Sequence, residues 1–272
     1  MKSLINTIKW EVNQPRADEY LHFSTDLQNP RHTCISWVHG YPMVDRPWMN
    51  TFPLLQGTAI HEYIHTIMHN REDWVYSSEV PIFVEDRKSE YFWKGTADAY
   101  LQDHDGTTWL IDYKTASGVS LSFMNEPKPE HVLQVSAYYH YGFNMVDKVG
   151  ILYLPSSPDY KRRWEEPRFY EIEPLTEQAV NDTMTMVEDD ITMYFTHNIL
   201  PEPLEGAYSW KHNKRNKNWE RWYKPHYSSM FCPWKDQEVD LCGCSTQKPE
   251  LMEVVDIDPA LESDSIKENE KE

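Results

Sequence analysis

Patterns of apolar and polar residues divide most of the chain into predicted helices and strands. Two segments have the spacing of amphipathic helices, namely Leu54 to about Asn70 and residues 129–145. Four segments have the apolar runs or alternation of strands: residues 75–85, 90–101, 107–115 and 148–154. Because the second helix lies between the last two strands, it predicts a strand–helix–strand crossover. We therefore expect an α/β core with a central mixed β-sheet flanked by helices.

The rest of the chain differs in composition from this core. A late strand (Arg168 to Ile172) and a long helix (Thr176 to about His197) are predicted before Pro201, and loop-like sequence after it. We expect four regions: an N-terminal cap region (1–50) rich in Pro, Trp and His, a core (51–200), a basic and aromatic region that contains cysteines (201–249), and an acidic disordered tail (250–272).

Two neighbouring predicted strands carry the most informative polar residues. Asp98 lies on the first, and Asp112 and Lys114 on the second, with a hairpin turn predicted at Asp105-Gly106 between them. Since alternate side chains of a strand share a face, Asp112 and Lys114 point the same way. Two carboxylates and a lysine at one sheet surface form a site for a hard divalent cation beside a positive group. This arrangement is typical of phosphodiester cleavage.

The cation that fits such a site is Mg²⁺ or Mn²⁺, with Asp98 and Asp112 as ligands. A water bound to the metal becomes a better nucleophile, and the metal offsets charge on the phosphate. Lys114 is expected to orient that water or to stabilise the developing negative charge. Taken alone, an Asp-x-Lys pair is more often an exposed salt bridge, so the neighbouring motifs decide between the two interpretations.

Five short motifs follow one another between residue 57 and about residue 154. They are Gly57-x-x-x-His61, Glu79 before an apolar run, Asp98, Asp112-Tyr113-Lys114 and Gln134-x-x-x-Tyr138. In this order and spacing the chain resembles the PD-(D/E)XK nuclease superfamily, and within it the RecB-like exonuclease branch. Each motif is weak alone, whereas five in order are specific.

The resemblance implies a restriction-endonuclease-like core and a metal-dependent DNA exonuclease acting in recombination, repair or phage DNA processing. It assigns metal binding to Asp98 and Asp112, adds His61 as a further ligand, and includes Glu79 among the candidate catalytic residues with Lys114. It gives DNA positioning to two residues of one helix, Gln134 and Tyr138, which share a helical face because they are four positions apart. A non-catalytic DNA-binding or assembly subunit with the same fold is the main alternative.

A second alternative comes from His61-Glu62-Tyr63-Ile64-His65, which is a literal H-E-x-x-H zinc metalloprotease motif. On a helix the two histidines would share a face, with Glu62 as general base. The extended form of the motif fails, because Met68 and Arg71 stand where a glycine and a third histidine are needed. We therefore expect His65 to be a packed or exposed helix residue without a chemical role.

The four cysteines are placed as one before the core, Cys34, and three after it, Cys232, Cys242 and Cys244. Some RecB-like nucleases have the same layout and bind a [4Fe–4S] cluster, which the resemblance implies here, as in iron–sulfur nucleases of the phage or CRISPR-adaptation type. The spacing of the last three departs from the usual pattern. Zinc in place of the cluster, with His226 as a further ligand, and four unligated thiols remain alternatives.

The net charge of −18 is unevenly distributed along the chain. The segment from Glu250 to the end has nine acidic residues and two lysines, whereas Lys211–Lys224 has six basic residues and one acidic residue among tryptophans. Basic residues interleaved with aromatic ones suit single-stranded nucleic acid, and Lys161-Arg162-Arg163 with Trp164 is a smaller patch of this kind. We expect DNA, as ends or single strands, to be the main partner.

The acidic tail is a candidate contact for a recombination or replication protein. No apolar stretch approaches about 18 residues, which argues against a transmembrane helix. The first residues lack the long apolar region of a secretory signal. We therefore expect a cytoplasmic protein, encoded by a cell or by a phage, with no membrane partner.

Overall fold

The structure is a computed structural model that describes residues 19–28, 30–40, 48–85 and 87–201, and the backbone of 208–212, 219–223 and 250–251. Within the first part, residues 48–51 and 53 are described by their backbone alone. The chain divides into two compact units, Met1–Glu202 and Pro203–Glu272, each of which is described by itself.

The first unit contains the predicted core elements and two earlier ones. In chain order they are β1 (Tyr20–His22), α2 (Pro30–His39), α3 (Trp48–His69), β2 (Val75–Val84), β3 (Phe92–Gln102), β4 (Thr108–Ser117), α4 (Gly118–Ser122), α5 (Pro129–Gly142), β5 (Lys148–Ser157), β6 (Arg168–Ile172) and α6 (Glu177–His197). Every strand and helix predicted between residues 54 and 197 is present. The predicted cap region, residues 1–50, contributes β1 to the sheet.

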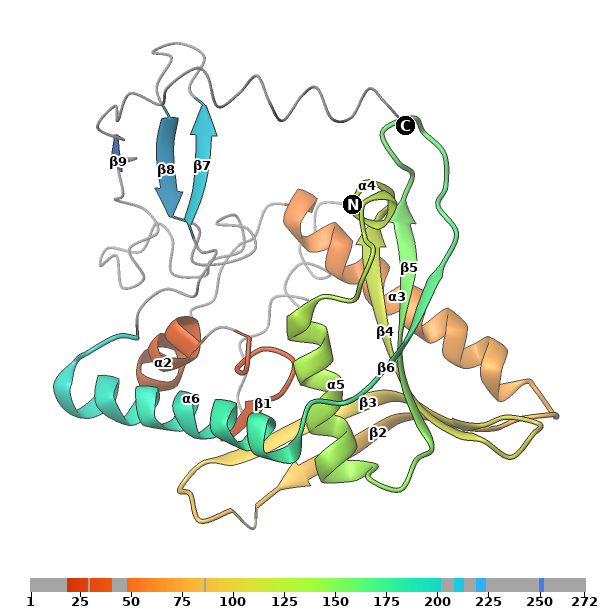
Figure 1. Cartoon of the computed structure of the whole chain (residues 1–272), viewed down its shortest axis with the longest axis horizontal. Coiled ribbons are helices and arrows are strands. Elements are labelled where there is room, and N and C mark those ends of the chain that lie inside the picture. The colour runs from red at the N-terminus through yellow and green to blue at the C-terminus, as the bar shows by residue number, and fades with distance from the viewer. Residues whose placement is uncertain are drawn as a thin grey trace, which may run out of the picture. The chain divides into compact units, whose positions relative to one another are not determined.

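These strands form one mixed sheet of six strands in the order β1-β3-β4-β5-β6, with β2 paired to β3 (Figure 1). β4 and β5 are parallel, as the crossover through α5 requires, and β2, β4 and β6 run antiparallel to their neighbours β3, β3 and β5. The prediction of a restriction-endonuclease-like α/β core, with a central mixed sheet flanked by helices, is confirmed at the level of architecture.

Two strands, β1 and β4, pair with the same edge of β3, and the sheet has an opening between them. β1 pairs in parallel with residues 92–94, whereas β4 pairs with residues 99–102. Between these two ladders, residues 95–98 have no strand pairing on that edge among the described residues. β4 separates from β3 beyond the Ala99 and Ile111 pair. The opening therefore exposes the middle of β3 to side chains from both faces of the sheet.

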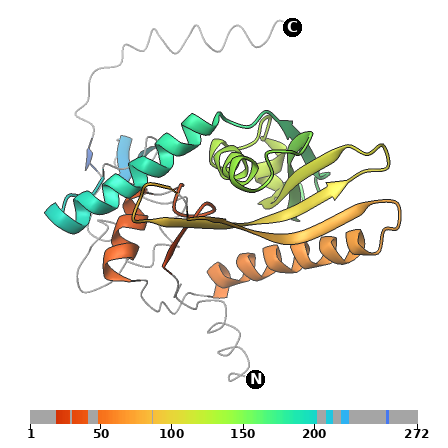
Figure 2. The ribbon, with the colours of Figure 1, turned by 90° about the horizontal axis from the view of Figure 1, so that it is seen from below.

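Helices cover both faces of this opening. α3 lies on one face and α5 on the other, as Figure 2 shows, and α6 lies on the side of α5, where it contacts both α5 and α2. The ring of Tyr138 from α5 lies over β3 at Gly95, where a Cβ atom would come within 2.4 Å of the ring. Phe23, just after β1, packs against both Tyr138 and Trp93. The core thus holds α5 against the segment of β3 that lies between the β1 and β4 ladders.

A buried polar network joins α6 to the hairpin between β2 and β3. Trp93 donates its indole N–H to Glu188 Oε1 at 2.6 Å, and Arg87 Nε lies 3.5 Å from the same oxygen. The N-terminus of α6 is capped by Thr176, whose hydroxyl accepts from Ala179 N. Since a buried carboxylate is costly without partners, these contacts fix α6 in register with the sheet.

The second unit corrects the prediction of loop-like sequence after Pro201. The backbone forms three antiparallel strands, β7 (Tyr208–His212), β8 (Trp219–Tyr223) and β9 (Glu250–Leu251). Aromatic residues favour strands, and here they form them even among many basic residues. The rest of the acidic tail, and the role predicted for Lys211–Lys224, lie outside the residues whose side chains are described. In the described part of the chain, no helix combines the length and the hydropathy that crossing a bilayer demands.

Replacing Gly95 with alanine should destabilise the protein by about 1–3 kcal/mol, because the new methyl group displaces Tyr138 and Phe23 from a filled core. The neighbouring Thr96 is exposed, so Thr96→Ala should change the free energy of unfolding by only about 0.5 kcal/mol or less. Urea unfolding of the two variants measures both values. Equal stabilities for the two would show that the ring of Tyr138 is not held tightly over β3.

Candidate active site at the opening of the sheet

Asp112 and Lys114 lie on one face of β4, beside the opening. The side chain of Asp112 is buried, with 1% of its surface exposed, and its Oδ2 atom lies 2.6 Å from Lys114 Nζ. Oδ2 accepts no hydrogen bond of normal geometry, although it is shielded from solvent. Lys114 remains 19% exposed, so one end of this ion pair is reached by solvent. The predicted Asp-x-Lys pair is therefore a partly buried ion pair rather than an exposed surface salt bridge.

Asp98 comes from the segment of β3 that pairs neither with β1 nor with β4, and its side chain bridges to β4. Its Oδ2 atom accepts a hydrogen bond from the backbone N–H of Tyr113 at 2.6 Å. Burial, and after it the nearby negative charge of Asp112, raise the pKa of Asp98 to about 8, against the lowering effect of Lys114. The structure thus brings the two predicted carboxylates close enough to disfavour both being charged in the absence of a cation.

His61 approaches the same site from α3. Its Nδ1 atom lies 3.8 Å from Asp98 Oδ1, and its ring packs edge-on against Tyr113. Burial, followed by the positive charge of Lys114, lowers the pKa of His61. The imidazole is therefore neutral at neutral pH, which is the form that can coordinate a metal.

Glu79 lies across the β2–β3 ladder from Asp98. The pairs Ser78–Ala99 and Val80–Ala97 place Glu79 opposite Asp98, and the backbone there has a φ of 51°. This left-handed conformation lies within β2, between the two flanking register pairs. The Glu79 side chain is 55% exposed, and its Oε1 atom lies 3.9 Å from His65 Nδ1. The structure therefore places Glu79 at the rim of the site and not among its buried groups.

Gln134 and Tyr138 reach the site from α5. The side-chain amide of Gln134 donates to Tyr138 Oη at 2.7 Å and, in a longer bond of 3.4 Å, to Asp112 Oδ1. Its carbonyl oxygen accepts from Gln28 Nε2 at 3.4 Å. Both side chains are buried. Gln134 thus links Asp112 to Tyr138 and supports the orientation of that carboxylate.

Tyr153 and His131 were not predicted from the sequence. Tyr153 of β5 is the register partner of Lys114, and its hydroxyl accepts from Lys128 N at 3.1 Å. The same hydroxyl lies 2.7 Å from His131 Nδ1, to which it can donate. Burial and the charge of Lys114 lower the pKa of His131 to about 3, so this histidine is neutral. Only the parallel register of β4 and β5 reveals the pair, because neither residue belongs to a recognisable motif.

The donor set fits a hard cation. Asp98 and Asp112 offer carboxylate oxygens, burial and then the charge of Asp112 raise the pKa of Asp98, and Asp112 Oδ2 is a buried oxygen without a well-formed hydrogen bond. With His61, however, they do not form a group whose donor atoms all lie within 4.8 Å of one another. Mg²⁺ commonly takes one or two carboxylates and keeps several waters, which suits such an open arrangement.

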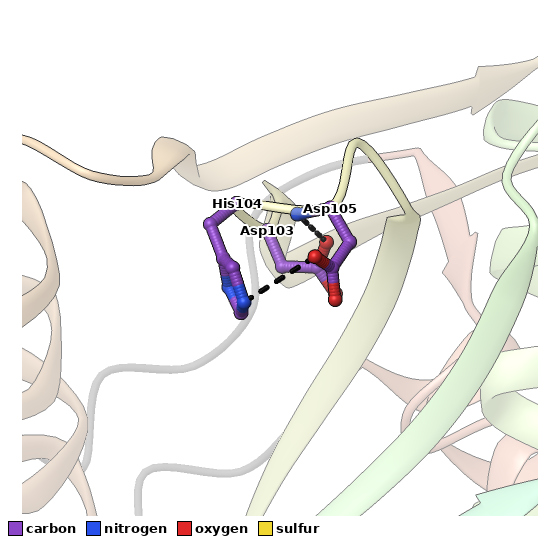
Figure 3. A group of neighbouring side chains, drawn as sticks. All are labelled: Asp103, His104 and Asp105. Carbon is purple, nitrogen blue, oxygen red and sulfur yellow. Dashed lines mark hydrogen bonds and ion pairs between the residues drawn. The ribbon is translucent and has the colours of Figure 1, made fainter.

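A tighter acidic group occurs elsewhere, in the β3–β4 hairpin. Within the described part of the chain, Asp103, His104 and Asp105 have donor atoms within 4.8 Å of one another (Figure 3). Asp103 Oδ1 accepts from the backbone N–H groups of Asp105 and Thr107, which is the geometry of the turn itself. Gly106 follows with a φ of 84°, as predicted for this hairpin. The grouping is explained by the turn.

The H-E-x-x-H residues separate in the structure. His65 is buried against the rings of Tyr76 and Tyr113, with 7% of its side chain exposed. Glu62 is exposed. His61 alone of the three is placed beside the carboxylates of β3 and β4. The expectation that His65 is a packed helix residue agrees with this position.

Cys34 is buried within α2 and is not part of a disulfide bond. Burial, and then the negative charge of Asp190, raise the pKa of its thiol to about 12. The other members of the predicted cluster, Cys232, Cys242 and Cys244, lie outside the described residues, as does His226. The iron–sulfur, zinc and free-thiol alternatives therefore stay predictions.

The metal-free protein should lose stability as pH rises, because folded Asp98, with a pKa of about 8, binds its proton more tightly than the unfolded chain does. This contribution is fully present below pH 3.8 and is lost as the pH passes through about 8. In EDTA at pH 8, Asp98→Asn should therefore raise the free energy of unfolding by about 1 kcal/mol or more. The gain should disappear near pH 4, and urea titrations at both values measure it.

Comparisons with known proteins give a limited result. No protein-family model matches the chain, and no curated protein matches it. Among solved structures, a crystal structure of a protein called SSO0001 is similar to this chain, with 19% sequence identity and a TM-score of 0.49, over 71% of this chain and 84% of that one.

Proposed function

We propose that this protein is a metal-dependent DNA exonuclease of the RecB-like PD-(D/E)XK type, acting in recombination, repair or phage DNA processing. The observation that carries the proposal is the meeting of Asp98, Asp112 and Lys114 at the opening of the sheet. Burial and mutual repulsion raise the pKa of Asp98 to about 8 there, in the way expected of carboxylates that await a divalent cation.

In this proposal Asp98 and Asp112 hold Mg²⁺ or Mn²⁺, and His61 is an additional ligand in its neutral form. When bound, the cation lowers the pKa of a coordinated water and offsets negative charge on the scissile phosphate. Lys114, held 2.6 Å from Asp112, presents a fixed positive charge beside that position. It orients the attacking water or stabilises the charge that develops on the phosphate oxygens.

The residues of α5 act through Asp112. Gln134 donates to Asp112 Oδ1 and to Tyr138, so one oxygen of the carboxylate has a hydrogen bond while the other lies beside Lys114 and would be the one to hold a cation. The buried pair of Gln134 and Tyr138 is thus a positioning device for the metal ligand. Glu79, at the exposed rim, is a candidate for contact with substrate.

Linear DNA labelled at its ends, compared with a sealed circle, tests the reaction. Wild-type protein with Mg²⁺ should degrade the linear DNA and spare the circle, and EDTA should stop the reaction. Asp112→Asn keeps the size of the side chain but removes its charge, and should lower the rate by about 100-fold or more. Cleavage of the circle would reassign the protein as an endonuclease. A folded Asp112→Asn variant with full activity would exclude the proposed site.

Lys114→Gln and Glu62→Gln separate this proposal from a zinc protease. Lys114 adjoins the proposed reaction centre, so its loss should reduce DNA cleavage by about 100-fold or more. Glu62 is exposed on α3 and would be the general base of a protease, yet its replacement should leave DNA cleavage within about 2-fold of wild type. His65→Ala is a poorer probe, because it leaves a cavity beside Tyr113. The opposite ranking of the two variants would contradict the nuclease assignment.

A further inference from the structure

The connection between β5 and β6 presents large aromatic side chains to solvent beside basic ones. Tyr160 is 64% exposed and Trp164 is 65% exposed. Lys161, Arg162 and Arg163 lie between them and are also exposed. Phe123, at the end of α4, is 71% exposed. Aromatic rings of this size seldom stay in water without a reason when several come from adjoining segments.

The segment of α4 and Phe123 contacts the β5–β6 connection where that connection begins. A Cβ atom on Gly118 would lie 2.6 Å from backbone atoms of Ser157, Pro158 and Asp159, so α4 begins in direct contact with the end of β5. Asp159 is buried and accepts from the backbone N–H groups of Lys161 and Arg163. These bonds curl the connection into a turn whose tip carries the basic residues.

The residues after α4 are also bonded to β6, where the β5–β6 connection ends. The carbonyl oxygen of Met124, the residue after Phe123, accepts from the guanidinium of Arg168 and, at 3.0 Å, from Tyr170 Oη. Arg168 Nη2 also lies 3.8 Å from Glu165. Phe123 is therefore held beside the connection by bonds from the first residues of β6. The aromatic residues share one rigid support and are not borne on independent loops.

This support is continuous with the proposed active site. Tyr170 packs edge-on against Tyr153, with ring centroids 5.8 Å apart, and Tyr153 is the register partner of Lys114 on β4. Moreover, β4 and β5 are parallel, so both run from the site toward the same end of the sheet, where α4 and the β5–β6 connection begin. The direction of β4 and β5 from Lys114 and Tyr153 therefore leads to the end of the sheet that carries the exposed aromatic residues.

We propose that Phe123, Tyr160 and Trp164, with Lys161 and Arg162, form a platform for unpaired nucleotides of a single DNA strand that leads to the active site. This inference rests on the proposed nuclease function. Bases stack on exposed aromatic rings whatever their sequence, and the basic side chains meet the phosphates between them. Lys161 already lies over the ring of Tyr160, with Nζ 5.4 Å from its centroid. The platform brings positive charge to a protein whose net charge is −18.

The test is the binding of a short fluorescein-labelled oligothymidylate, followed by anisotropy in EDTA so that no metal-dependent cleavage occurs. The variant Phe123→Ala/Tyr160→Ala/Trp164→Ala should bind about 100-fold more weakly or worse, since each of the three lost base stacks alone costs about 5-fold or more. Phe195→Ala is the matched control, because Phe195 is 74% exposed on α6, and it should bind like wild type.

The outcomes separate the platform from the nuclease reaction. Unchanged binding by the triple variant, or an equal loss in Phe195→Ala, would overturn the platform. So would a wild-type protein that binds duplex DNA but not the oligonucleotide. If the oligonucleotide binds through these three residues but Mg²⁺ produces no cleavage, the platform stands and the proposed reaction fails. If cleavage occurs while the triple variant binds normally, the reaction stands and the platform fails.

The basic residues give a second, independent measure of the same surface. Lys161→Ala/Arg162→Ala should reduce the slope of log K against log salt concentration by about 1.4, because each phosphate contact on a single strand contributes about 0.7. The triple aromatic variant should leave this slope unchanged, since stacking releases no counterions. A slope that is the same in wild type and in Lys161→Ala/Arg162→Ala would show that phosphates do not lie at this turn.

Discussion

The hydrogen bond from the Tyr113 N–H to the carboxylate of Asp98 is the interaction on which the site depends. Where β4 leaves β3, a backbone donor of β4 loses the carbonyl partner that a continuous ladder would give it. Asp98 supplies the missing acceptor from its side chain, so the sheet can open without leaving a buried N–H group unsatisfied. The same bond fixes Asp98 next to the strand that carries Asp112 and Lys114. The same hydrogen bond therefore allows the sheet to open and brings the charged side chains together.

Electrostatics and packing pull in opposite directions at this opening. Burial favours neutral side chains, yet Asp112 is almost wholly buried and Asp98 lies beside it. One positive charge, that of Lys114, is close enough to compensate one of them. The remaining negative charge is disfavoured until a proton or a cation joins it. Such a site is destabilising for the fold by itself, as active sites often are, and the surrounding helices hold it together.

Much of this fold could be predicted from the sequence, because its core elements obey simple periodicities. The crossover from β4 through α5 to β5 followed from element order, and the contact of Gln134 with Tyr138 from helical spacing. The β1 strand was missed, since three residues of a Pro-rich region show no alternation. Strands β7 and β8 were missed because basic residues masked an aromatic strand pattern. Tyr153 and His131 could not be found from the sequence pattern, since the place of Tyr153 beside Lys114 depends on the pairing of β4 with β5.

The backbone of Glu79 has a consequence for how this chain tolerates change. A left-handed conformation costs a residue with a Cβ atom about 1–2 kcal/mol, which glycine would avoid. The chain nevertheless has a glutamate there, opposite Asp98 in the ladder. The pairs on either side of Glu79 keep their register, so the strained backbone lies at a single position within a continuous strand. The strain is therefore kept at a residue that places a carboxylate at the rim of the site, and not at a glycine that would adopt the same backbone freely.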